Sequence, residues 1–404
     1  MRLRENLRSL VNASLFAPAS VRCQALLLSA LARVAGRRSV AVGSHAERIV
    51  IIKLDRIGDF VMVTPFLREL RRNFPKAWIT LVVSDLVHPL AEHCPHVSEV
   101  LIAPRRAPGM RGIWRQWHDW ITLAWGRLLP LRATLAILPR WDIDLYQSYA
   151  LLAFTHARRR VSYSTQVSAE KAQRNRGADR LLTEAVQPTS THHEVEKNLS
   201  LLRAIGLTVT RDQEELWPVA DGEALLRRLL PDRAGHFLIG LCPCSAEAIK
   251  DWPLPRFLAV VKHFSHRPRV TFLLLVGPEY AALSTEPAVQ ALPNLVSLAG
   301  QLSLDETAAL LGQCSLVLTV DTGLMHIASA LQRPLVLVSG LSAEHEPNSH
   351  YSPTRFGPWQ ADCTLVAPLD PKTGPRRIDT VTLKQVVTAV ASRLPPDSSM
   401  LASN

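Results

Sequence analysis

Apolar residues follow two alternating patterns in the first half of the chain. Residues 48–54 (RIVIIKL) form a continuous β-branched run that predicts a buried parallel strand. Between residues 60 and 70 apolar side chains recur at helical spacing, and residues 78–83 predict the next strand. These three segments together predict a β-α-β unit.

The same alternation continues along the chain and restarts after residue 216. Helices are expected at residues 195–205, 254–263 and 303–311. Further strands are expected at residues 97–102, 134–138, 237–241, 270–276, 295–298, 316–320 and 335–339. This pattern predicts an α/β protein with two doubly wound, Rossmann-like domains facing a central cleft. We expect an N-terminal extension at 1–46, one domain at 47–215 and the other at 216–404.

The N-terminal extension has the pattern of one or two basic amphipathic helices. Arginines separate four apolar residues at helical spacing: Leu3, Leu7, Leu10 and Val11. Such a helix either lies on an anionic membrane surface or packs on the protein's own body, and the pattern leaves both open. The apolar run at residues 25–32 is too short to span a membrane and lies at the short edge of signal-peptide length.

Composition and charge narrow the class of protein. Hydrophobic residues make up 47% and charged residues 20% of the 404, which is typical of a globular protein. The net charge of +11 attracts anions such as nucleic acid, anionic lipid or phosphorylated molecules. No nucleic-acid-binding motif is present, so we expect no nucleic-acid partner. Six cysteines without paired spacing indicate neither a zinc site nor a disulfide framework and fit a cytoplasmic protein.

The loop after the first strand carries the first candidate chemistry. Gly58 lets the backbone approach a ligand closely, and Asp59 has the chemistry of a general base, with Asp55 as its rival. The alternative for Asp59 is helix capping. Lys53 and Arg56 flank these residues.

A second loop of the same kind follows the strand at 316–320. Thr322 and Gly323 open a helix whose amino end suits a diphosphate, with His326 one turn further on. The alternatives are that Asp321 only caps this helix and that His326 is a core residue.

Two further loops carry polar residues after strands. Lys250, which follows Ser245, has the charge to neutralise a departing phosphate, or it is an ordinary solvated lysine. Trp252 is expected to pack a helix. Glu279 either accepts hydrogen bonds from ribose hydroxyls or lies in a surface turn.

The remaining candidates lie in the first domain. The spacing of four tryptophans predicts one face of a helix that packs in the core, and the alternative is a face that lies at a membrane interface or stacks on a sugar. They are Trp114, Trp117, Trp120 and Trp125. Arginines between residues 158 and 180 suit a phosphorylated acceptor or a solvated face. Asp142 and Asp144 either orient an acceptor or cap the next helix.

Four segments in this order form a joint pattern: residues 51–59 (IIKLDRIGD), 250–253 (KDWP), 276–279 (VGPE) and 320–326 (VDTGLMH). With them the sequence resembles glycosyltransferase family 9, the lipopolysaccharide heptosyltransferases, over roughly residues 47–394. The first 46 residues lie outside the family pattern. The resemblance implies a GT-B fold and inverting transfer without a metal or other cofactor.

The resemblance also implies roles for individual residues. Asp59 is similar to the catalytic base, and Lys250 to the clamp on the diphosphate. The residues similar to donor-binding ones are Gly58, Ser245, Glu279, Leu302, Asp321, Thr322, Gly323 and His326. In that scheme Glu279 holds the ribose, Leu302 packs on the base and Asp321 grips the sugar. The acceptor-side candidates are Lys53, Asp55, Arg56, Asp142 and Asp144.

The function implied is transfer of heptose from ADP-heptose, as co-substrate, to the lipopolysaccharide core or a related anionic glycolipid. The expected location is cytoplasmic, with peripheral contact at the cytoplasmic face of the inner membrane. One alternative is a family member that uses another nucleotide sugar for O-antigen, capsule or another surface glycan. A weaker alternative is a non-catalytic, nucleotide-binding relative.

Overall fold

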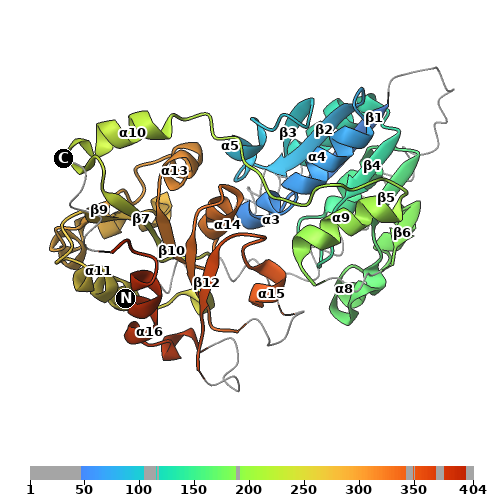
Figure 1. Ribbon diagram of the computed structural model, residues 1–404. Helices are drawn as coiled ribbons and strands as arrows, with labels where there is room; N and C mark the ends of the chain where they lie inside the picture. The colour runs from blue at the N-terminus through green and yellow to red at the C-terminus, as the bar shows by residue number, and fades with distance from the viewer. Residues whose placement is uncertain are drawn as a thin grey trace. The chain divides into compact units, whose positions relative to one another are not determined.

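The computed structural model describes residues 47–103, 115, 118–187, 192–342, 349, 351–369 and 377–396 (Figure 1). The predicted N-terminal helices lie outside these residues, as do Trp114 and Trp117. Among the helices that are described, none combines the length and the apolar character that crossing a membrane requires.

The described chain divides into two compact units. One comprises residues 47–54, 74–82 and 101–187, and the other comprises residues 55–73, 83–100 and 192–396. The second unit therefore includes two short segments from the first half of the sequence. The domain limits expected at residues 46 and 216 stay predictions.

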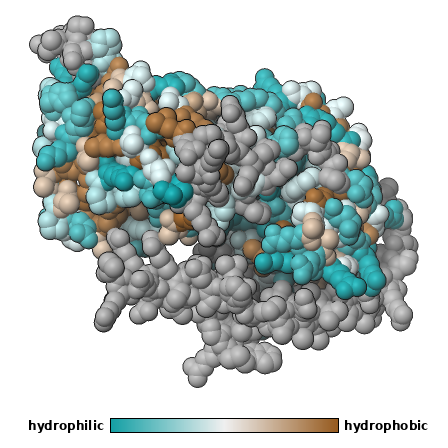
Figure 2. Space-filling view, turned by 90° about the horizontal axis from the view of Figure 1, so that it is seen from below, coloured by the Kyte–Doolittle hydropathy of each residue, from teal (hydrophilic) through white to brown (hydrophobic). Residues whose placement is uncertain are grey.

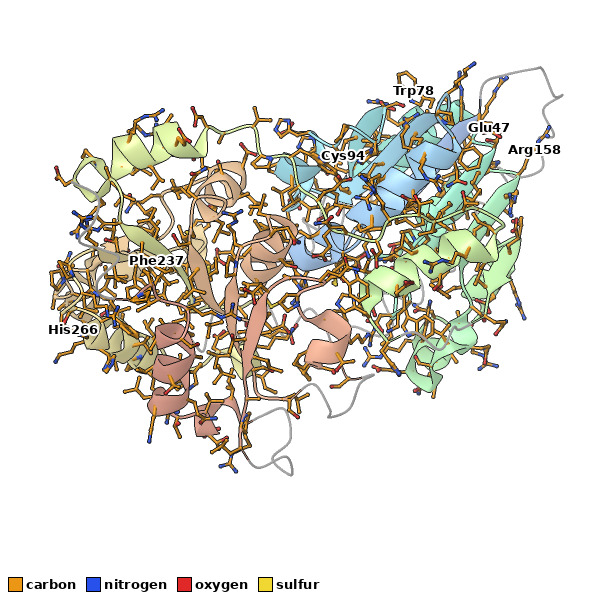
Figure 3. All side chains as sticks on the ribbon, viewed as in Figure 1. Glu47, Trp78, Cys94, Arg158, Phe237 and His266 are labelled. Atoms are coloured by element: carbon orange, nitrogen blue, oxygen red, sulfur yellow. The ribbon has the colours of Figure 1, made fainter. Side chains whose placement is uncertain are left out.

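The first sheet has the strand order β3-β2-β1-β4-β5-β6. Its strands are β1 (Arg48–Lys53), β2 (Trp78–Ser84), β3 (Glu99–Ala103), β4 (Leu135–Leu138), β5 (Arg159–Tyr163) and β6 (Glu184–Val186). The β1–β4, β4–β5 and β5–β6 pairs are parallel. At the start of β2, the Trp78 backbone N–H donates to the Glu47 carbonyl at 2.8 Å, and the indole projects outward, 50% exposed (Figure 3).

The second sheet has the order β12-β11-β10-β7-β8-β9, with parallel pairing throughout. Its strands are β7 (Phe237–Cys242), β8 (Val270–Leu274), β9 (Leu295–Ser297), β10 (Leu316–Val320), β11 (Leu335–Val338) and β12 (Cys363–Val366). In β8, β10 and β11 every residue is buried, as expected for strands covered on both faces.

Helices cover both sheets (Figure 1). Those formed before residue 192 are α3 (Ile57–Val61), α4 (Thr64–Asn73), α5 (His88–Ala91), η1 (Ala124–Leu128), η2 (Leu129–Leu131), α7 (Ser148–Phe154), η3 (Thr165–Val167), α8 (Ala169–Arg174) and η4 (Ala178–Leu181). Later ones are α9 (Glu194–Ala204), α10 (Gly222–Leu229), η5 (Pro231–Arg233), η6 (Ala248–Lys250), α11 (Leu254–His263), η7 (Pro278–Thr285), α12 (Pro287–Gln290), α13 (Leu304–Leu311), α14 (Gly323–Ala330), α15 (Pro353–Phe356), η8 (Ile378–Thr380) and α16 (Leu383–Ala391). Within the second unit, α4 packs on α9, α3 on α14, and α11 on α16.

The apolar stretch at residues 60–70 is two helices rather than one. The helix α3 ends at Val61 and α4 begins at Thr64, with Pro65 in its first turn. Because proline disfavours a helical conformation in the residue before it and lacks an N–H, the ladder breaks there. The Thr64 hydroxyl donates to the Val61 carbonyl at 2.8 Å and closes the junction.

The surface mixes polar and apolar side chains. On the face seen in Figure 2, hydrophilic residues cover most of the described surface and hydrophobic ones gather in smaller groups. Of the two tryptophans described in the insert, Trp120 is 6% exposed and belongs to the core, whereas Trp125 is 48% exposed. Of these two residues, only Trp120 lies in the core as predicted.

Candidate functional site

The loop after β1 places four polar or small residues at the start of α3. Arg56 is the N-cap residue and makes no side-chain capping bond, and Asp59 lies in the first helical turn. Asp59 is therefore not the N-cap residue, although a carboxylate at this position still favours the helix dipole. Asp59 is partly exposed, whereas Asp55 is only 5% exposed and its carbonyl accepts a hydrogen bond from Ser84.

The loop after β10 presents the amino end of α14. Thr322 is the N-cap residue and makes no side-chain capping bond. The Asp321 carboxylate accepts from the Lys250 ammonium at 2.8 Å, so it serves an ion pair. The interpretation of Asp321 as a mere helix cap is wrong.

Lys250 lies in a charged and partly enclosed environment. Burial by itself lowers the pKa of Lys250, but the attraction of Asp321, assisted by Glu247, outweighs it and the pKa is raised. The side chain is 19% exposed, and its ammonium lies 5.6 Å from the centre of the Tyr351 ring. Lys250 is thus a fixed positive charge, not a solvated surface lysine.

The loop between β7 and η6 is held by its own hydrogen bonds. The Ser245 hydroxyl donates to the Glu247 carbonyl at 2.7 Å, and the Ser245 N–H donates to Asp251 at 2.8 Å. Glu247 also pairs with Arg56 at 2.9 Å, which ties this loop to the one after β1. Trp252 is 1% exposed and packs on α11, as expected.

The Glu279 and Leu302 segments meet the same loop. Glu279 is exposed at the start of η7, and the hydroxyl of its neighbour Tyr280 donates to the Ser245 carbonyl at 3.1 Å. Gly300 has a φ of +69°, and a Cβ there would lie 2.7 Å from Ala281 in η7. Leu302 therefore follows a turn that lies directly against the Glu279 helix.

The ion pair of Lys250 and Asp321 forms one wall of a pocket in the second unit. Its empty volume is about 260 Å³, open mouth included. The lining residues are Ile249, Lys250, Asp321, Val338, Ser339, Gly340, Leu341, Tyr351 and Ile378. Among the residues described, no group of three His, Cys, Asp or Glu side chains has the arrangement of a metal site.

His326 is a core residue by its position. It is 3% exposed, its ring lies against Gly58, and its Nδ1 is buried without a hydrogen-bond partner in the described part of the chain. Burial lowers the pKa of His326 to about 4, so the ring is neutral near pH 7. The core alternative describes its surroundings, and a role in binding phosphate stays a prediction.

The acceptor-side candidates in the first unit have structural partners. The Lys53 ammonium donates to the Pro139 carbonyl at 3.3 Å. The Asp144 carboxylate accepts from the backbone N–H groups of Tyr146 and Tyr149, each at 3.0 Å, and so caps the start of α7. Asp142 is partly exposed. Capping therefore accounts for Asp144, and acceptor contact by Lys53 and Asp142 stays a prediction.

The basic segment is partly structural as well. Arg159 pairs with Glu184 on the neighbouring strand at 2.7 Å, and the Arg160 guanidinium donates to two backbone carbonyls. In contrast, Arg176 and Arg180 are exposed. Of these four arginines, Arg159 and Arg160 thus have structural partners, and only Arg176 and Arg180 remain as candidates for acceptor contact.

The sequence pattern does not indicate three residues of this site: Glu247, Tyr280 and Tyr351. Each lies in an irregular segment or just inside a 3-10 helix, where no periodic pattern exists. Position after a strand was the only available signal, and it would have found Tyr280 beside Glu279.

This chain is similar to known proteins in sequence and in fold. The family described as "Glycosyltransferase family 9 (heptosyltransferase)" matches residues 144–374, more than half of the chain. Lipopolysaccharide heptosyltransferase 3 of Escherichia coli is 23% identical over 288 residues, which are 70% of this chain and 80% of that protein.

Two solved structures show the same fold. A family 9 glycosyl transferase from Veillonella parvula DSM 2008 has a TM-score of 0.69 at 20% identity, covering 90% of this chain and 100% of that one. The E. coli ADP-heptose lps heptosyltransferase II has a TM-score of 0.65 at 20% identity, covering 86% and 98%. The predicted α/β class with two Rossmann-like sheets of the GT-B type is confirmed. The chain belongs to glycosyltransferase family 9, and it is a glycosyltransferase.

Proposed function

We propose that this glycosyltransferase moves heptose from ADP-heptose to a lipopolysaccharide core or a related anionic glycolipid, with inversion at the anomeric carbon. The observation that carries the proposal is the Lys250–Asp321 ion pair, which is partly buried beside a pocket and at the amino end of α14. The names of the relatives, which include lipopolysaccharide heptosyltransferase 3, support heptose as the sugar.

Asp59 acts as the base in this proposal. An acceptor hydroxyl oxygen forms a bond to the anomeric carbon while the bond from that carbon to the diphosphate oxygen breaks. Asp59 takes the hydroxyl proton, and ADP leaves with the bonding electron pair. The partial exposure of Asp59 at the start of α3 is compatible with access of a hydroxyl.

The donor side stabilises the departing diphosphate. Lys250 supplies a positive charge whose pKa is raised by Asp321, and the amino end of α14, which has no side-chain cap, supplies the positive end of a helix dipole. Asp321 then holds hydroxyls of the sugar, Ser245 and Thr322 contact phosphate, and Glu279 binds the ribose. None of these contacts requires a metal ion.

The acceptor and the membrane belong to the same proposal. Trp125 and Ile121 are 48% and 41% exposed, and they are four residues apart on one helical face beside Arg127. Exposed aromatic and basic side chains favour an anionic lipid surface. We place the enzyme at the cytoplasmic face of the inner membrane, where a glycolipid acceptor is presented.

A donor panel tests the proposal. Purified protein is incubated with ADP-heptose and with other nucleotide sugars in the presence of inner-core glycolipid, and the released nucleoside diphosphate is measured. ADP release from ADP-heptose alone supports the proposal, and release only from another donor favours the alternative of a different surface glycan. No release from any donor contradicts transfer.

Two variants assign the roles. Asp59→Asn should lower kcat by about 100-fold or more while ADP affinity is kept, as expected for a general base. Asp232→Asn, at an exposed aspartate in η5, is the matched control. Lys250→Met should weaken ADP binding, with the exposed Lys262→Met as its control. Full transfer by Asp59→Asn would exclude this residue as the base.

A further inference from the structure

The two loops of the site are joined by a reciprocal contact between α3 and α14, which lie side by side in the second unit (Figure 1). A Cβ on Gly58 of α3 would lie 2.5 Å from Cδ2 and 2.9 Å from Nε2 of His326 on α14. A Cβ on Gly323 of α14 would lie 2.8 Å from Cβ and 3.0 Å from Cγ2 of Ile57 on α3. Each helix therefore offers a glycine to a side chain of the other.

Backbone conformation does not explain these two glycines. The described glycines with positive φ are Gly177, Gly206, Gly235 and Gly300, and neither Gly58 nor Gly323 is among them. Other residues could therefore adopt the same φ and ψ at these positions. What the contact requires is the absence of a side chain, because real Cβ atoms do not approach neighbours within 3.0 Å.

The His326 ring is packed in the interior, away from solvent. Its ring is almost fully buried, and its Nδ1 has no partner among the described residues. Its pKa, lowered by burial to about 4, keeps it neutral. The neutral ring therefore meets Gly58 through van der Waals contact and not through charge.

We propose that Gly58, Ile57, Gly323 and His326 form an interlock that positions Asp59 relative to the donor-side residue Asp321. Asp59 directly follows Gly58, and Asp321 precedes Gly323 by two residues, so the contact fixes the backbone at both. A displacement of about 1 Å at a reacting group can cost about 100-fold in rate. The proposal rests on the proposed function, and it assigns His326 as a positioning residue.

The test is a double-mutant cycle on the Gly58–His326 pair. Gly58→Ala forces a methyl group against the ring, His326→Ala removes the ring, and the double variant removes the clash. Gly126→Ala is the control for Tm and ADP affinity, since a Cβ at Gly126 would meet nothing within 4 Å. For each protein we measure Tm, the Kd for ADP, and kcat and KM with ADP-heptose.

The interlock predicts that Gly58→Ala lowers kcat by about 100-fold with ADP affinity within about threefold of the wild type. The double variant should recover at least about tenfold of that loss, since the effects of residues in contact do not add. If Gly58→Ala does not fold, recovery of a folded protein by the double variant supports the interlock in the same way.

Two results would overturn the interlock. The first is a double variant that is no more active and no more stable than Gly58→Ala. The second is a His326→Ala protein with wild-type kcat and ADP affinity weakened more than about tenfold, which would make His326 a phosphate ligand. If the wild type transfers no sugar, the proposed function fails and positioning of a catalytic Asp59 fails with it, whereas the Tm values of the four proteins of the cycle still test the Gly58–His326 contact.

Discussion

Glu214 is a carboxyl group in a fully buried site, and its replacement tests how the second unit responds to pH. It is 2% exposed, and its Oε2 accepts from the Ser329 hydroxyl of α14 at 2.9 Å. Its Oε1 is buried without a partner in the described part of the chain. Burial raises the pKa of Glu214 from 4.5 to about 8, with the Ser329 hydrogen bond opposing the shift. The native carboxyl is therefore protonated at pH 7.

The direction of the pH effect follows from proton binding. Between pH 4.5 and about 8 the folded protein keeps a proton on Glu214 that the unfolded chain has lost. The contribution of Glu214 to the stability of the protein is therefore greatest below pH 4.5 and falls as the pH rises from 4.5 to about 8. The slope is about 1.4 kcal/mol per pH unit, so the loss between pH 5 and pH 7 is on the order of 2–3 kcal/mol.

The perturbation is Glu214→Gln, which keeps the shape and removes the titration. The assay is urea unfolding of both proteins at several pH values, comparing the free energies of unfolding. The difference between the two proteins cancels the contributions of His193 and His326, whose pKa values burial lowers to about 4. The free energy of unfolding of the variant should rise relative to that of the wild type by roughly 2–3 kcal/mol between pH 5 and pH 7. Parallel pH profiles for the two proteins would refute a protonated, buried Glu214.

Three further predictions follow from buried polar groups. Lys171 is fully buried, and burial lowers its pKa to about 7. The free energy of unfolding of the wild type should therefore rise relative to that of Lys171→Met between pH 7 and pH 10. The same pH dependence in both proteins, measured by urea unfolding, would contradict this. Trp252→Ala should lower the free energy of unfolding, measured in urea, by about 3–5 kcal/mol, because it leaves a cavity and removes the hydrogen bond from the indole N–H to the Val381 carbonyl. A loss below about 1 kcal/mol would argue against tight packing around Trp252. Asp144→Ala should lower the free energy of unfolding by about 1–2 kcal/mol, because it removes the cap on α7, and it should leave the KM for the glycolipid acceptor unchanged. A large rise in KM with the stability intact would instead make Asp144 an acceptor ligand.

The regular elements of the second sheet were predictable because their patterns are local. The strand at 316–320 and the helix at 254–263 have the bounds expected from their apolar runs. The strands β5, β6 and β12 were not predicted. β5 begins with two arginines, and in β12 only Val366 is buried, so neither carries a clear apolar pattern.

The candidate site was predictable only in part. Position after a strand indicated Lys250 and Asp321, and the structure joins them at 2.8 Å. Their pairing depends on strand order in space, which no local pattern encodes. Arg355 illustrates the same limit, since it is 3% exposed and pairs with Glu194, 161 residues earlier in the chain, at 2.6 Å. Charged residues enter the interior where a distant partner compensates, and that partner is unknown from sequence.

The membership of residues 55–73 in the second unit has a consequence for biosynthesis. This segment is anchored there by long-range bonds, such as Asn198 to the Met62 carbonyl and Thr210 to Glu69. A ribosome adds about 5–20 residues per second, so the early segment waits on the order of ten seconds for its partners to emerge. During that interval α4 has an apolar face without its final cover. A nascent chain halted before residue 190 should therefore be a better chaperone client than one halted after residue 215.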